Sequence, residues 1–175
     1  MEMTAIEPVS GHQKGKVVEC TREYIDQAGS LFGRSFDPIE ITFDIRGKTA
    51  GMYRVANGKR LIRYNPFLFA KYFEDNLANT VPHEVAHYIT DVLFGLKKIR
   101  PHGAEWKNIM ACFGAEPTRT CTYNMDGIPT RQFRIFSYKC ECSVHQLTSR
   151  RHNQIQLRRK TYICRKCRQS LSPEN

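Results

Sequence analysis

The sequence predicts an α+β protein in which helices pack on a small β meander and a small cysteine-rich domain follows at the C-terminus. Three observations support this fold class. Apolar residues recur at helical spacing in two long runs, they alternate with polar residues between those runs, and four of the seven cysteines lie within the last 36 residues. A chain of 175 residues, of which 41% are hydrophobic, can bury one core plus a small appendage.

The N-terminal part is predicted to contain one helix and the meander. Residues 1–16 lack apolar periodicity and are expected to form a flexible arm. From Val17 to Phe32 apolar residues recur at helical spacing, and Gly33 follows as a terminator. Alternating apolar residues then predict three short strands, the last two flanking an Asn-Gly-Lys turn; these strands span residues 39–45, 52–55 and 61–64.

A second helical run extends from about Asn76 to Phe94, and Gly95 suits its end. Pro82 lies inside this run. Because proline removes an amide donor and crowds the preceding turn, we expect a kink or a helix start near Pro82.

The charge distribution divides the chain near residue 130. Residues 1–130 carry 16 Lys and Arg against 15 Asp and Glu, whereas residues 131–175 carry 11 against 2. We therefore expect one domain over residues 17–130 and a second, basic domain over residues 131–175. A net charge of +9 on 45 residues favours a polyanionic partner, most often nucleic acid.

The cellular setting is predicted from cysteine usage and hydropathy. No segment approaches the roughly 20 consecutive apolar residues that cross a bilayer, and the first residues lack the apolar core of a signal peptide. An odd number of cysteines, crowded at one end, is more typical of metal ligation in a reducing compartment than of a disulfide framework. We expect a cytoplasmic protein with no membrane partner.

The segment VPHEVAHYITDVLFGLKKIRPHGAEW, residues 81–106, carries a pattern typical of catalytic zinc sites. His83 and His87 are four residues apart, so both imidazoles face the same side of a helix, while Glu84 points about 100° round the helix, beside the ligand set. His102 lies on a predicted turn and suits a third ligand, which leaves a fourth position for water. Chance histidines on a polar helix face are the alternative interpretation.

The C-terminal cysteines predict a second zinc site. Cys164 and Cys167 have the spacing of a zinc knuckle, whereas Cys140 and Cys142 are one residue closer together than usual. His145 competes with Cys142 for the fourth ligand position, and Cys142 is favoured. Free thiols in a packed hairpin are the alternative. Three other cysteines are isolated and receive no function; they are Cys20, Cys112 and Cys121.

A basic run, RRHNQIQLRRK, separates the two cysteine pairs. Its composition suits a solvated hairpin that binds phosphates, although a charged solubilising face is the usual role of such runs. Tyr138 and Tyr162 flank the run and are more typical of hydrophobic support than of base stacking. The candidate phosphate-binding residues are Arg150, Arg151, Arg158, Arg159 and Lys160.

The combination of VPHEVAH, RPHGAEW and a C-terminal YKC…RRHN…YICRKC resembles the bacterial SprT family, relatives of the eukaryotic Spartan protease. The resemblance extends from about residue 17 to residue 171. It implies a compact gluzincin-like metalloprotease domain followed by a zinc ribbon, with a link to DNA-bound proteins. Carried over by motif, His83, His87 and His102 match the zinc ligands and Glu84 matches the catalytic base. The Cys140-x-Cys142 pair departs from the more usual C-x-x-C spacing.

These observations predict a zinc metallopeptidase with one catalytic and one structural zinc ion. Its expected substrates are proteins, aligned along an exposed edge of the meander and brought to nucleic acid by the basic ribbon; the resemblance implies that they are DNA-bound or DNA-crosslinked. Tyr64, Tyr88 and Arg100 are candidates for an oxyanion stabiliser. Two alternatives are a non-catalytic zinc-containing nucleic-acid-binding protein and a zinc hydrolase acting on a small ester or amide.

Overall fold

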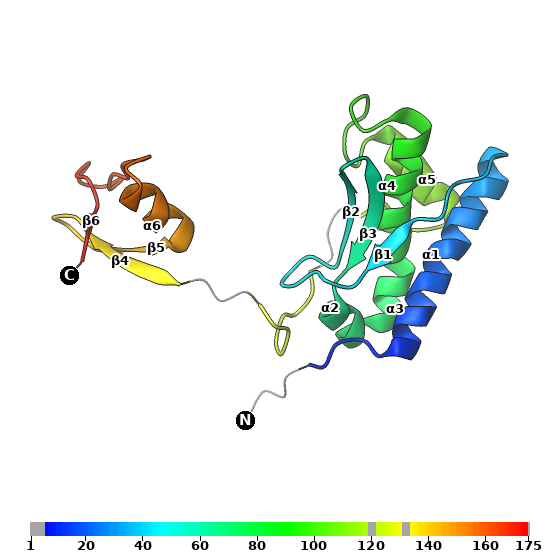
Figure 1. The fold of residues 1–175 in the computed structure, drawn as a ribbon, viewed down its shortest axis with the longest axis horizontal. Coiled ribbons are helices and arrows are strands. Elements are labelled where there is room, and N and C mark those ends of the chain that lie inside the picture. Colours follow the sequence, from blue (N-terminus) through cyan, green and yellow to red (C-terminus); the bar gives the residue numbers. More distant parts are fainter. Residues whose placement is uncertain (1–5, 119–121, 131–133, 175) are drawn as a thin grey trace. The chain divides into compact units, whose positions relative to one another are not determined.

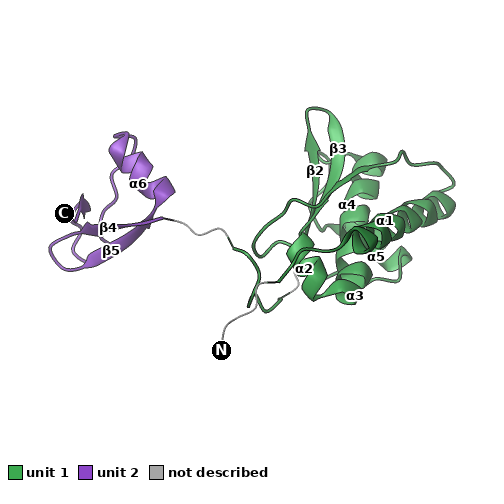
Figure 2. Ribbon diagram, turned by 60° about the horizontal axis from the view of Figure 1, so that its bottom comes forward, with its two compact units in different colours: residues 1–130 green, residues 131–175 purple. Residues whose placement is uncertain are grey.

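The computed structural model describes residues 6–118, 122–130 and 134–174. They form two compact units, residues 1–130 and residues 131–175, which are treated separately below (Figure 2). Both units mix helices with a small three-stranded sheet, as the α+β prediction expects (Figure 1). Among the described residues, no helix is long and apolar enough to cross a bilayer.

Helix α1, Gly11–Phe32, starts earlier than the apolar pattern predicts. A capping box explains the start: the Gln13 amide donates to Ser10 Oγ, and the Ser10 amide donates to Gln13 Oε1. The described part of the predicted arm is also ordered, because the Val9 amide donates to the Pro66 carbonyl and its side chain is buried. The prediction of a flexible arm is therefore wrong for residues 11–16, which belong to α1.

The sheet of the first unit contains β1 (Glu40–Thr42), β2 (Gly51–Ala56) and β3 (Lys59–Tyr64). Its order is β1-β3-β2, with β3 antiparallel to β2 and parallel to β1, so the predicted meander is wrong. The connection over residues 43–50 is long enough to leave room for β3 between β1 and β2. Strand β2 is consequently an edge of this sheet.

Three short segments lead into α4 (Val81–Phe94), the helix of the HExxH motif. They are α2 (Pro66–Lys71), α3 (Phe73–Asp75) and the π-helical turn η1 (Asn76–Thr80). Pro82 lies in the first turn of α4, which confirms the predicted helix start. Within the widened turn, the buried Asn76 amide donates to the carbonyls of Leu68 and Tyr72, and its Oδ1 accepts from Thr80 Oγ1. These bonds stabilise the chain directly before the motif.

Helix α4 is the central element of the first unit. It packs against α1 and α5 (Ala104–Cys112) and also contacts β2 and β3 (Figure 1). Val81, Val85, Ala86 and Ile89 are fully buried along it. Burial of this apolar face fixes the direction in which the remaining α4 side chains point.

The second unit has the strand order β5-β4-β6, formed by β4 (Ile135–Lys139), β5 (Val144–Thr148) and β6 (Ser172–Pro173). The basic run forms helix α6, Ser149–Gln156, followed by a turn, so the predicted hairpin is wrong. A tertiary contact explains the helix: His152 stacks on Phe136 of β4 with ring centroids 3.7 Å apart, and its Nδ1 lies 3.0 Å from the Tyr138 hydroxyl. Tyr138 is buried, as its predicted supporting role requires.

Candidate metal centres

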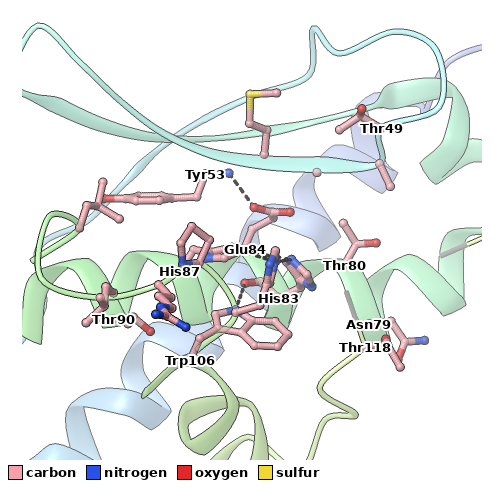
Figure 3. Close-up of a pocket in the computed structure, with 18 of the residues that line it drawn as sticks. Thr49, Tyr53, Asn79, Thr80, His83, Glu84, His87, Thr90, Trp106 and Thr118 are labelled. Carbon is pink, nitrogen blue, oxygen red and sulfur yellow. Dashed lines mark hydrogen bonds between the residues drawn. The ribbon is translucent and has the colours of Figure 1, made fainter. Parts of the chain in front are cut away.

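The three predicted histidines converge at one point of the first unit (Figure 3). His83 and His87 project from successive turns of α4, and His102 precedes α5 in a left-handed conformation with φ 56°. Their Nε2 atoms are 3.1–3.2 Å apart. Tetrahedral zinc with Zn–N bonds of about 2.0–2.1 Å separates its nitrogen ligands by about 3.3 Å, so this set fits a zinc ion.

Trp106 of α5 forms the floor of the histidine cluster. Its ring contacts all three imidazoles, with centroid separations of 4.7–5.6 Å, and its Nε1 donates to the His83 carbonyl. Burial, together with a smaller effect of the neighbouring imidazoles, lowers the pKa of His83 to about 4 and that of His87 to about 3. The two rings are therefore neutral near pH 7 and keep a lone pair for a metal ion.

Glu84 lies beside the histidines and points toward β2 (Figure 3). Its Oε2 accepts the Tyr53 backbone amide at 2.6 Å, and the residue is 5% exposed. Burial raises the pKa of Glu84 to about 8, and the hydrogen bond from Tyr53 partly opposes that rise. The glutamate is thus a stronger base than an exposed carboxylate.

A cleft of about 490 Å³ opens over the histidines and Glu84. Strand β2 forms one wall, and α4 and the segment between α4 and α5 form the others. In Figure 3, Thr49, Asn79 and Thr118 lie on one side of Glu84, and Tyr53 lies on the other. An extended chain laid along β2 would therefore pass the histidine cluster.

Of the three candidate oxyanion stabilisers, the structure places Arg100 in the cleft wall and the two tyrosines elsewhere. Tyr64 is fully buried and its hydroxyl pairs with Thr21 Oγ1, while the buried Tyr88 donates to the Asp37 carbonyl. Neither lines the cleft, whereas Arg100 does.

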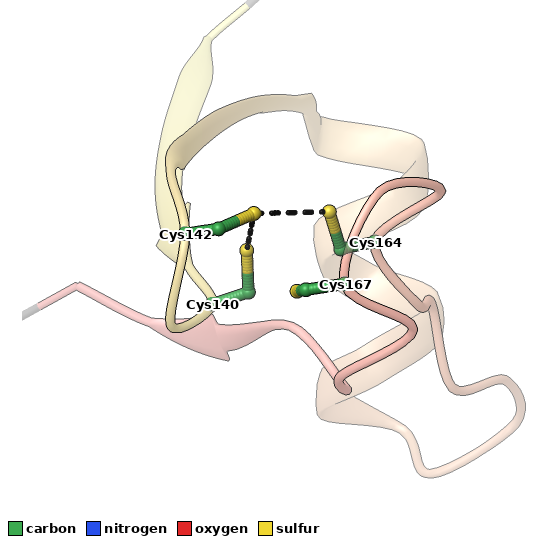
Figure 4. Close-up of side chains that lie close together, drawn as sticks. All are labelled: Cys140, Cys142, Cys164 and Cys167. Atoms are coloured by element: carbon green, nitrogen blue, oxygen red, sulfur yellow. Dashed lines mark hydrogen bonds between the residues drawn. The ribbon is translucent and has the colours of Figure 1, made fainter.

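The second unit brings four sulfur atoms together (Figure 4). Cys140 Sγ and Cys142 Sγ are 3.5 Å apart, and Cys142 Sγ and Cys164 Sγ are 3.7 Å apart; Cys167 completes a group whose atoms all lie within 4.8 Å. Tetrahedral zinc with Zn–S bonds of about 2.3 Å separates its sulfur ligands by about 3.8 Å, so the group fits zinc. His145 stands beside this group, with Nε2 3.2 Å from Cys140 Sγ.

The predicted phosphate-binding residues are all exposed in the second unit. Arg150 and Arg151 belong to α6, and Arg158, Arg159 and Lys160 belong to the turn that follows. The described ion pairs, Arg60–Asp91 and Arg63–Asp44, include none of these five side chains. The ring of Tyr162 lies 5.7 Å from the Arg151 guanidinium.

Comparison with known proteins identifies both units. Residues 21–126 match the model of the SprT-like family, and residues 135–175 match the model of the SprT-like zinc ribbon domain. The chain belongs to the SprT-like family. Protein SprT of Vibrio parahaemolyticus is 38% identical over 91% of this chain and 90% of its own length. Protein SprT of Actinobacillus succinogenes is 32% identical over 94% and 93%, respectively, and Protein SprT of Pseudomonas paraeruginosa is 37% identical over 91% and 93%. No solved structure matches the chain.

In this SprT-like chain, sequence reasoning missed three residues that surround the site. Trp106 supports the histidines, the Tyr53 amide holds Glu84, and Gly51 allows β2 to approach Glu84. A signal for Gly51 would have been available had the strand been extended to include it, because a glycine within a strand often marks a close backbone approach. The other two contacts join residues that are distant in sequence, and periodicity carries no information about such pairs.

Proposed function

We propose that this chain is a zinc-dependent metallopeptidase. The observation that carries the proposal is the position of Glu84, whose carboxylate lies beside three convergent imidazole nitrogens in a cleft bounded by an edge strand. A zinc site with a purely structural role does not require a buried, basic carboxylate next to its ligands. The intact glutamate therefore favours hydrolysis over the non-catalytic alternative.

His83, His87 and His102 would hold the catalytic ion, and the four ribbon cysteines would hold a structural one. When bound, zinc lowers the pKa of a coordinated water toward about 7 and polarises a carbonyl. Glu84 would act as the general base, which takes a proton from the attacking water and passes it to the leaving amine. Its burial makes the carboxylate a stronger base, and Arg100 in the cleft wall is the residue proposed to stabilise the oxyanion.

The edge of β2 is the proposed substrate-binding element. Gly51, Tyr53 and Val55 line the cleft, and main-chain pairing along such an edge aligns a peptide through its backbone. Recognition of this kind depends little on side chains. A peptidase built in this way suits varied protein substrates.

Nucleic acid is the proposed partner of the zinc ribbon. The support is the net charge of +9 over residues 131–175 and five exposed basic side chains on and after α6. Binding there would bring the peptidase unit to proteins held on or crosslinked to DNA. The predicted setting remains the cytoplasm.

The test compares the parent with Glu84→Gln and with Glu19→Gln, a matched change at an exposed position of α1. Zinc content and proteolysis of a basic DNA-binding protein are measured with and without DNA. We expect two zinc ions in all three proteins and loss of proteolysis in Glu84→Gln alone. Equal proteolysis in Glu84→Gln and parent would remove Glu84 from the mechanism. No proteolysis by the parent, with DNA binding intact, would favour the non-catalytic nucleic-acid-binding protein.

A further inference from the structure

The carboxylate of Glu84 is held by the strand that borders the cleft. Tyr53 belongs to β2 and Glu84 to α4, 31 residues further along the chain, and their N–H···O separation is 2.6 Å. This N···O distance is short for a hydrogen bond from a backbone amide, whose usual range begins at about 2.7 Å. The general base is therefore attached to the substrate-binding edge before any substrate is present.

Gly51 makes this close approach possible. A Cβ atom at this position would lie 2.7 Å from Glu84 Cγ, 2.7 Å from Thr80 Cγ2 and 2.8 Å from Glu84 Oε1. Such distances are well inside van der Waals contact, so a side chain there would push β2 away from α4 or displace Glu84. The absence of a side chain is thus a steric requirement of the Glu84 position.

A second set of contacts fixes β2 on α4. The Tyr53 hydroxyl donates to Asp91 Oδ2 at 2.6 Å, and Arg60 Nε donates to the same oxygen at 2.7 Å. Asp91 is buried and lies two helical turns after Glu84. Because the strand is held here as well, the Tyr53 amide keeps a defined position over the cleft.

The same amide is the donor that an added strand needs. In an antiparallel pair, residues alternate between those whose N–H and C=O face the partner strand and those whose groups face away. The Tyr53 N–H bonds to α4, so it faces away from β3, as do the main-chain groups of Gly51 and Val55. An extended peptide that joins this edge and Glu84 therefore compete for one N–H.

We propose that a substrate main chain pairing with β2 takes the Tyr53 amide from Glu84 and releases the carboxylate toward the histidine cluster. The inference rests on the proposed function and adds that the substrate itself regulates the availability of the base. The base becomes available only when an extended peptide is aligned on the edge strand. A single amide without flanking main chain leaves the Tyr53–Glu84 bond in place and is a poor substrate.

The exchange of hydrogen bonds can be observed in the zinc-loaded full chain by NMR after labelling its eight tyrosines with ¹⁵N. Tyr53→Phe identifies the Tyr53 resonance by removing it. We expect this amide proton to lie far downfield, to move upfield in Glu84→Gln and to stay in place in Glu19→Gln. An unchanged position in Glu84→Gln would show that the bond is absent in the loaded protein.

The competitor is a ten-residue Thr-Val peptide whose central peptide bond is replaced by a ketomethylene group. Saturation of the parent should move the Tyr53 amide upfield toward its Glu84→Gln position, whereas N-acetyl-valine methylamide should leave it unmoved. A peptide that fails to bind, or that binds without moving this resonance, overturns the inference. The two proposals fail separately. If the peptide moves the Tyr53 resonance but no protein is cleaved, the peptidase proposal alone is refuted. If proteins are cleaved but the peptide does not move the Tyr53 resonance, this inference alone is refuted.

Gly51→Ala supplies a second readout, with Gly15→Ala on α1 as the control because a Cβ there meets open space. The Gly51 variant should keep two zinc ions, lose the downfield Tyr53 resonance and reduce the preference in kcat/KM for an extended peptide over a single amide at least tenfold. A parent-like preference together with a displaced Tyr53 resonance would show that the Tyr53–Glu84 bond does not restrain the base.

Discussion

Trp106→Phe tests whether the indole floor organises the histidine site. The change removes one hydrogen bond, from Nε1 to the His83 carbonyl, and part of a ring that contacts His83, His87 and His102. The lost bond costs about 1 kcal/mol, and the volume lost at this fully buried position adds about 1–2 kcal/mol. We expect the unit to stay folded, since phenylalanine keeps an apolar ring in the core.

The larger effect should fall on metal affinity. Groups that orient metal ligands typically change affinity about 10–100-fold when they are altered. Competition with a chelator should therefore remove the histidine-bound zinc of Trp106→Phe at a chelator concentration about 10–100-fold lower than for the parent. The ribbon zinc of the same chain is the internal control. Equal chelator midpoints for the histidine-bound zinc in variant and parent would refute the argument that Trp106 organises this site.

Three further predictions concern ligands, pH and charge. His102→Ala should lower zinc content from two ions to one, and Cys142→Ser should weaken ribbon zinc more than His145→Ala, as metal analysis under chelator competition would show. In the metal-free chain, the pKa of Glu84 is raised to about 8, so between pH 6.5 and 8 the folded state holds a proton that the unfolded state has lost. The free energy of unfolding should therefore fall as the pH rises through this range, by at most about 1.4 kcal/mol per pH unit. Urea unfolding followed through the single tryptophan measures this slope, and Glu84→Gln should flatten it. Joint replacement of Arg150, Arg151, Arg158 and Arg159 by Gln should weaken DNA binding, while the zinc content stays at two. It should also flatten the salt dependence of binding, because the logarithm of the affinity falls with the logarithm of the salt concentration with a slope of about −0.7 to −0.9 per phosphate contacted. Parent-like affinity and salt slope in that variant would contradict the nucleic-acid assignment.

Local patterns predicted the elements that carry the candidate metal ligands. Helical spacing placed His83 and His87 on one face of α4, and the Cys164-x-x-Cys167 knuckle needs only local geometry. The start of α1 at Gly11 was missed because a capping box consists of polar residues and leaves no apolar period.

Features that depend on distant contacts could not be read from periodicity. Strand order is an example, since alternation is the same whether β1 pairs with β2 or with β3. The basic run became a helix because His152 stacks on Phe136, a contact between α6 and a separate strand. The bond between Glu84 and the Tyr53 amide likewise joins elements that no local pattern connects.

Proteolysis of a basic DNA-binding protein, with DNA present, by the zinc-loaded parent and by Glu84→Gln decides whether this chain is a peptidase. The amide of glutamine cannot accept the proton of a metal-bound water, although it preserves the size of the side chain. We expect two zinc ions in both proteins and a loss of cleavage by orders of magnitude in the variant. Cleavage by Glu84→Gln at the rate of the parent would contradict the proposed role of Glu84.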